Sequence, residues 1–180
     1  EPYTSRLFRM TGEEILESYL GSVSVEETFQ MKNKLYDKYN NLITNINFNL
    51  ALLQIIMVPV NNTKTHTWSA ETAAQANGEI IITLKSTYAN EHIVFGAYFP
   101  LEKYSIIFTP GAAYADNSLL EVSDTERWVG QEVKIYVTPF DKYNNYIDAS
   151  IYKDVSPYQI KYSNEKELNN FATENLNYFS

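Results

Sequence analysis

Hydrophobic and polar residues alternate with period two along much of this 180-residue chain. The alternation is clear over residues 29–33, 80–84, 133–138 and 158–163, where every second side chain is mostly apolar. Period two places successive side chains on opposite faces of a strand, so one face packs into a core and the other meets solvent. The pattern therefore predicts a chain built mainly of β-strands.

The segments between these runs complete a set of short strands. Residues 47–58 are apolar enough for one long strand or two, and Asn77-Gly78 is a strong hairpin signal. The composition of residues 70–77 favours a helical turn instead. Residues 13–19 (EEILESY) are the one convincing helical candidate, with Thr11 as a cap, and we expect a short helical connector there.

A nearly identical motif occurs twice. Residues 36–43 read YDKYNNLI and residues 140–147 read FDKYNNYI, so the aspartates lie 141 − 37 = 104 positions apart. The flanking alternation stays in register, which indicates an internal repeat. A structural turn explains the motif because Asp caps nearby N–H groups and Asn tolerates positive φ, whereas a calcium loop needs more oxygen ligands. The predicted turn residues are Asp37, Asn40, Asn41, Asp141, Asn144 and Asn145.

The spacing of the two motifs predicts a domain organisation. Residues 1–12 resemble residues 104–111 and are expected to be the last strand of a preceding repeat. Residues 13–111 are expected to form one complete repeat, and residues 112–180 a linker and the first half of a following repeat. The chain would then be a piece of a longer tandem array.

The strand–turn pattern resembles one known family. Residues 129–147 (VGQEVKIYVTPFDKYNNYI), residues 77–108 and the EPYTSRLF start resemble filamin/ABP280-type immunoglobulin-like repeats. Bacterial invasin-like immunoglobulin repeats share a similar turn and are a second match. The resemblance implies an all-β fold of tandem immunoglobulin-like sandwiches, one complete and one partial. Departures from the family pattern include Glu79 after the Asn-Gly pair.

Catalysis is not expected. The chain has no Cys, its two histidines, His66 and His92, belong to no ligand motif, and no nucleophile or phosphate-loop motif occurs. We therefore expect no enzyme activity, no metal and no cofactor. A net charge of −8 argues against binding to nucleic acid, and the longest apolar run, residues 50–60, is too short for a membrane span.

The resemblance implies a scaffold that spaces or crosslinks filaments and binds other proteins, including neighbouring repeats. Filamin-like repeats offer a groove between their third and fourth strands. Carried over to this sequence, the partner-binding residues would be Ile55, Met57, Val58, Thr65, Thr67 and Ser69. A cytoskeletal or ciliary location follows from this interpretation. Two alternatives remain open: an extracellular adhesion or surface-filament protein, and an appendage of an enzyme whose catalytic domain lies elsewhere.

Two further sets of residues bear on these alternatives. The linker, residues 111–130, is neither Gly/Ser-rich nor Pro-rich, so we expect it to pack, with Leu119, Leu120 or Trp128 buried between successive domains. Asn61-Asn62-Thr63 is a glycosylation sequon, and a glycan on Asn61 would indicate the secretory pathway.

Overall fold

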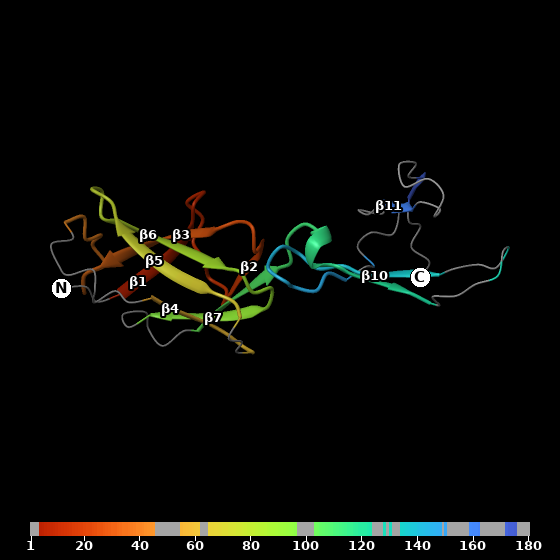
Figure 1. The fold of residues 1–180 in the computed structure, drawn as a ribbon. Coiled ribbons are helices and arrows are strands. Elements are labelled where there is room, and N and C mark those ends of the chain that lie inside the picture. The colour runs from red at the N-terminus through yellow and green to blue at the C-terminus, as the bar shows by residue number, and fades with distance from the viewer. Residues whose placement is uncertain are drawn as a thin grey trace. The chain divides into compact units, whose positions relative to one another are not determined.

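The computed structural model describes residues 4–45, 55–61, 65–96, 103–123, 128, 130, 134–148, 150, 159–162 and 172–175. The chain divides into two units, Glu1–Pro110 and Gly111–Ser180. Figure 1 shows strands throughout both units, and the described residues contain one short 3-10 helix. The prediction of a mainly β chain is confirmed.

Unit 1 contains two four-stranded sheets, with the orders β1-β3-β6-β5 and β2-β8-β7-β4. The sheets lie face to face as two layers (Figure 1). Neighbouring strands are antiparallel except β2 and β8, which are parallel. The strands are β1 (Thr4–Arg9), β2 (Tyr19–Ser24), β3 (Phe29–Tyr36), β4 (Ile55–Pro59), β5 (Trp68–Ala74), β6 (Glu79–Ser86), β7 (Glu91–Gly96) and β8 (Tyr104–Thr109).

The core lies between the sheets and follows the predicted alternation. On β6, the side chains of Ile80, Ile82 and Leu84 are buried, while the residues between them face outward. Met31 and Leu35 of β3 are buried in the same way. Burial of several large aliphatic side chains, each worth about 1.5–3 kcal/mol, holds the two sheets together.

The predicted helix over residues 13–19 is wrong. The segment is extended: Arg9 N–H donates to the Glu13 carbonyl at 2.7 Å, and Ile15 N–H donates to the Leu7 carbonyl at 2.8 Å. The chain turns at Gly12 and passes from β1 in one sheet to β2 in the other. Ile15 is buried along the way. Burial of this one apolar side chain and hydrogen bonding to β1 override the helical propensity of the glutamates.

The predicted helical turn at residues 70–77 is also absent, because Trp68–Ala74 forms β5. Its backbone pairs with β6 at the edge of the sheet. The Asn-Gly hairpin signal is confirmed, since Gln75 and Glu79 close a turn in which Gly78 has φ of 81°.

Unit 2 begins with a two-stranded sheet of β9 (Leu119–Val122) and β10 (Ile135–Thr138), preceded by the 3-10 helix η2 (Ala115–Asn117). A second pair joins β11 (Gln159–Tyr162) to β12 (Ala172–Asn175).

The same strand pairing opens both units. Leu7 of β1 pairs with Asn33 of β3, and Leu120 of β9 pairs with Val137 of β10. The 104-residue offset between the two Asp motifs makes Val137 the equivalent of Asn33, because 33 + 104 = 137. The strand pairs then make β9 the equivalent of β1, with Leu120 at the position of Leu7. The sequence pattern instead predicts that residues 1–12 close a preceding repeat, whereas Thr4–Arg9 pairs with Phe29–Tyr36 inside unit 1. Alternation identifies a strand but not its neighbour.

Candidate functional site

Asp37 organises the turn that follows β3. Its Oδ1 accepts hydrogen bonds from the backbone N–H groups of Tyr39 and Asn41, both at 2.8 Å, and its Oδ2 accepts one from Asn41 Nδ2 at 3.0 Å. Asn40 has φ of 64°, the left-handed conformation that Asn tolerates. The hydrogen bonds from Asn41 and Tyr39 lower the pKa of the Asp37 carboxyl. We call Asp37–Asn41 the Asp37 corner.

Asp141 organises the same turn in unit 2. Its Oδ1 accepts from the N–H groups of Tyr143 at 2.8 Å and Asn145 at 2.9 Å, and its Oδ2 accepts from Asn145 Nδ2 at 2.8 Å. Asn144 has φ of 64°, identical to Asn40. We call Asp141–Asn145 the Asp141 corner. In both corners the carboxylate accepts hydrogen bonds from backbone and amide N–H groups and so closes the turn.

The Asp141 corner has additional partners from the start of unit 2. Gly111 N–H donates to Asp141 Oδ2 at 2.9 Å, and Asn117 Nδ2 donates to the Asp141 carbonyl at 2.9 Å. Asp141 is completely buried, whereas Asp37 is half-buried. The two corners therefore share one geometry but differ in what covers them.

The predicted partner-binding residues lie on two different sheets. Ile55, Met57 and Val58 are in β4, an edge of one sheet, and Ser69 is in β5, an edge of the other. Thr67 N–H donates to Thr87 Oγ1 at 2.9 Å, just before β5. Thr65 is exposed. These edges lie on the same side of the sandwich, but the proposed binding role remains a prediction.

Proline limits the free edge of β4. Val60 N–H bonds to the Glu91 carbonyl of the neighbouring chain segment at 2.9 Å. Hydrogen bonding alternates along an antiparallel pair. The backbone N–H and C=O groups of Val58 therefore point toward β7, whereas the backbone groups of Met57 and Pro59 point toward the free edge. Pro59 has no N–H to offer there, and proline on an edge opposes the addition of another strand. The part of β4 open to an added strand is Ile55–Met57.

The outer face of the β2-β8-β7-β4 sheet is apolar. Ile56 and Val58 of β4 are 42% and 39% exposed and lie opposite Phe95 and Ile93 of β7. Ile107 of β8 is also exposed. We call these five residues the apolar outer face. The sequence analysis missed most of them, although a signal exists: β4 and β7 are apolar at consecutive positions instead of alternating, which predicts strands with two apolar faces.

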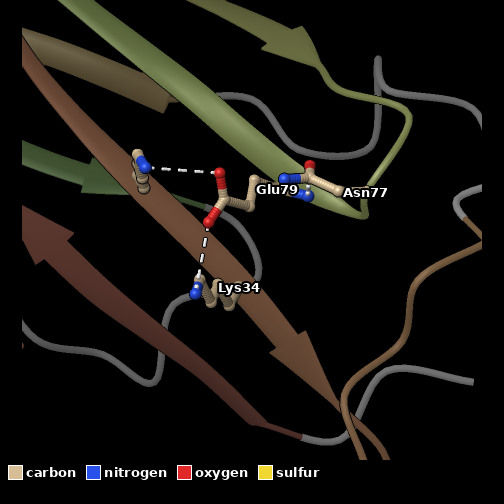
Figure 2. Close-up of polar contacts among 4 residues, drawn as sticks. Lys34, Asn77 and Glu79 are labelled. Atoms are coloured by element: carbon tan, nitrogen blue, oxygen red, sulfur yellow. Dashed lines mark hydrogen bonds and ion pairs between the residues drawn. The ribbon is translucent and has the colours of Figure 1, made fainter. Parts of the chain in front are cut away.

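The outer face of the other sheet is polar. Figure 2 shows the Glu79 carboxylate between two lysine side chains of β3. Glu79 lies 3.2 Å from Lys34 Nζ and 3.4 Å from Lys32 Nζ. Hydrogen bonds from Lys34 and Asn77 lower the pKa of Glu79. These oppositely charged side chains pair across neighbouring strands, which is typical of a solvated sheet face.

His92 lies in the core of unit 1 and is completely buried. Its Nδ1 lies 3.0 Å from the Asn90 carbonyl, which can only accept, so Nδ1 carries the proton. Its Nε2 lies 3.0 Å from Ser86 Oγ. Burial lowers the pKa of His92 because it disfavours the charged imidazolium. His66 instead stacks on Tyr88 with ring centroids 4.7 Å apart.

Leu119, Leu120 and Trp128 are 55%, 58% and 83% exposed. Their predicted burial between successive domains concerns the placement of the two units and remains a prediction. Asn61 is exposed, and glycosylation there also remains a prediction.

Within the described part of the chain, no three His, Cys, Asp or Glu side chains group as a metal site would require. A helix suited in length and hydropathy to crossing a bilayer is likewise not found among the described residues.

No protein-family model matches the sequence, and a search of curated proteins found no match. Among solved structures, the chain is similar to FdeC, described as a broadly conserved Escherichia coli adhesin, with a TM-score of 0.52 and 16% identity over 91% of this chain and 47% of that one. Domains 4–9 of the surface layer protein SbsC give a TM-score of 0.35 and 15% identity over 93% of this chain and 26% of that one. This chain spans less than half the length of either structure.

Unit 1 has the fold of an immunoglobulin-like β-sandwich. The sheet orders β1-β3-β6-β5 and β8-β7-β4 reproduce the two sheets of that fold, and β2 adds a parallel strand at one edge. The predicted fold class is thereby confirmed at the level of immunoglobulin-like repeats, and the filamin subtype is not distinguished.

Proposed function

We propose that this chain is a non-catalytic structural segment of a tandem immunoglobulin-like array exposed on a cell surface. The observation that carries the proposal is the repetition, in both units, of an edge-strand pair followed by an Asp corner. Repeating units of this kind suit a protein whose task is to provide length and to present surfaces for contacts.

The surface location is supported by the fold shared with FdeC, a protein described as an adhesin. The exposed Asn61 is compatible with that location. The sequence resemblance to filamin-type repeats supports a second interpretation, an intracellular scaffold that spaces or crosslinks filaments. No structural observation favours that interpretation over the first.

Location can be tested directly on cells of the source organism. Antibodies raised against residues 1–110 are applied to intact cells and to permeabilised cells, with an antibody against a cytosolic protein as the control. A surface protein is labelled on intact cells and is degraded by protease added outside. Labelling that appears only after permeabilisation would overturn the surface assignment and favour the scaffold.

The contact surface that we propose for this array is the apolar outer face together with the open part of β4, and its occupant is an extended apolar strand of a partner protein. The exposed Ile56 and Val58 would contact alternate side chains of that strand. Titration with extended peptides that alternate apolar and polar residues should shift the amide resonances of Ile55–Met57. In the Val58→Lys variant these shifts should be lost, and Lys34→Ala on the polar face is the control. Equal shifts in both variants would refute this surface.

A further inference from the structure

The segment that begins unit 2 is fastened to the Asp141 corner. Gly111 N–H bonds to Asp141 Oδ2, and Tyr114 N–H donates to the Phe140 carbonyl at 2.8 Å. Ser118 Oγ donates to the Tyr114 carbonyl at 2.8 Å and accepts from Phe140 N–H at 3.1 Å. This segment, Gly111–Ser118, is the junction segment, because β8 of unit 1 ends only two residues earlier, at Thr109.

The matching strand pairs of the two units show which residues of unit 1 are equivalent to the junction segment. Leu120 corresponds to Leu7, a difference of 113 positions, so Ser118 corresponds to Ser5 and Tyr114 to Glu1. By the same count, Gly111 corresponds to a residue placed three positions before Glu1. The partner that covers Asp141 in unit 2 would therefore come, in unit 1, from a segment leading into β1.

The Asp37 and Asp141 corners differ in hydrogen bonding and in burial. Among the described residues, Asp37 Oδ2 accepts from Asn41 Nδ2, whereas Asp141 Oδ2 accepts from both Asn145 Nδ2 and Gly111 N–H. Asp37 is also half-buried, whereas Asp141 is completely buried.

We propose that the Asp37 corner is a docking site for the backbone of a segment preceding β1, supplied by a preceding repeat of the same kind. The occupant is a peptide with the chemistry of the junction segment, in which a small residue places its backbone N–H against Asp37 Oδ2. Each Asp corner then fastens the connection from the repeat before it. This docking rests on the tandem array proposed above and not on its location.

Two extended forms of the full chain test the docking. One carries Thr-Pro-Gly-Ala-Ala directly before Glu1, which places Gly at the position equivalent to Gly111. The matched control carries Thr-Pro-Pro-Ala-Ala, which removes a single N–H donor and leaves the register unchanged. The amide exchange of the added Gly and the thermal midpoint of unit 1 are measured in both.

We expect the added Gly amide to exchange about tenfold or more slowly than in an unstructured peptide, because a charge-assisted hydrogen bond protects it. We also expect the Gly form to melt at a higher temperature than the Pro form. Free-peptide exchange of the Gly amide together with equal midpoints would overturn the proposal.

The hydrogen bond between Gly111 and Asp141 in unit 2 can be tested in the chain without an extension. Gly111→Ala keeps the N–H that bonds to Asp141, whereas Gly111→Pro removes it. The amides of Tyr143 and Asn145 should exchange faster in the Pro variant than in the Ala variant. Equal exchange in the two variants would show that the junction segment does not stabilise the Asp141 corner. The proposed docking of a preceding segment on the Asp37 corner would then be refuted as well.

Discussion

The Nε2 atom of His92 lies 3.0 Å from the hydroxyl oxygen of Ser86 within the sandwich core. With Nδ1 donating to the Asn90 carbonyl, Nε2 of the neutral ring can accept a hydrogen bond from the Ser86 hydroxyl. Ser86 Oγ also lies 3.2 Å from the Tyr88 carbonyl. The hydroxyl thus has a second acceptor available when the imidazole is protonated.

This arrangement predicts that unit 1 loses stability in mild acid. The pKa of folded His92 is lowered by burial, so below about pH 6.5 the unfolded chain binds more protons than the folded chain. The contribution of neutral His92 to the free energy of unfolding is fully present above that pH. It is lost as the pH falls towards the pKa of His92 in the folded chain. Urea unfolding at pH 7.5 and pH 5 should show the difference.

The His92→Leu variant provides the control, because Ser86 retains its contacts with Tyr88. Its stability should depend less on pH over that interval than the stability of the natural chain. An unchanged dependence would place the titrating group elsewhere.

Asn33 is a position of unit 1 at which the equivalent residue of unit 2 should increase stability. It is 2% exposed, its Oδ1 is buried without a hydrogen-bond partner, and Val137 occupies the equivalent position in unit 2. Asn33→Val should raise the free energy of unfolding of unit 1 by about 1–3 kcal/mol, because it removes an unsatisfied polar group. Urea unfolding measures the change, with the exposed Asn45→Val as control. A lower stability would mean that the amide has a structural role.

Glycine is required for different reasons at Gly12 and Gly78: positive φ alone at Gly12, and positive φ together with close backbone packing at Gly78. Both have positive φ, but a Cβ on Gly78 would lie 2.5 Å from the Ile43 carbonyl oxygen and from Thr44 Cα, whereas a Cβ on Gly12 would meet nothing within 4 Å. Gly12→Ala should cost about 1 kcal/mol from backbone strain alone. Gly78→Ala should cost clearly more because backbone atoms must shift, and equal thermal midpoints for the two variants would disprove the close approach.

Asn144 tests the conformation of the Asp corner. Its side chain is exposed and its φ is 64°. Asn144→Val should destabilise the turn by about 1–2 kcal/mol, because a β-branched residue is strained in the left-handed region, while Asn144→Gly should be tolerated. Hydrogen exchange of the Asn145 amide reports the opening of this turn. Similar exchange in the Val and Gly variants would argue against the corner geometry.

Local patterns predicted a large part of the fold. The alternation of Ile80, Ile82 and Leu84 identified a strand and its buried face, because period two admits few other structures. The Asn77-Gly78 turn was likewise readable, because it needs positive φ. These features depend on neighbours in the sequence.

Features set by distant contacts were not predictable. Residues 13–19 have helix-forming residues, yet burial of Ile15 and its bond to Leu7 impose an extended path. Trp68–Ala74 is a strand because β6 lies beside it, not because of its alanines. Among the candidate sites, the two aspartates were found from the repeat, whereas the difference between them depends on Gly111, which no motif links to Asp141.

The parallel pairing of β2 with β8 has a mechanical consequence. The two strands run in the same direction; β8 lies at the end of unit 1, and β2 follows β1 near its start. Once β1 has yielded, tension that reaches β2 and β8 from the two ends of unit 1 pulls them past each other, so their hydrogen bonds are loaded together and not opened one at a time. We expect this edge to withstand pulling better than a hairpin edge would.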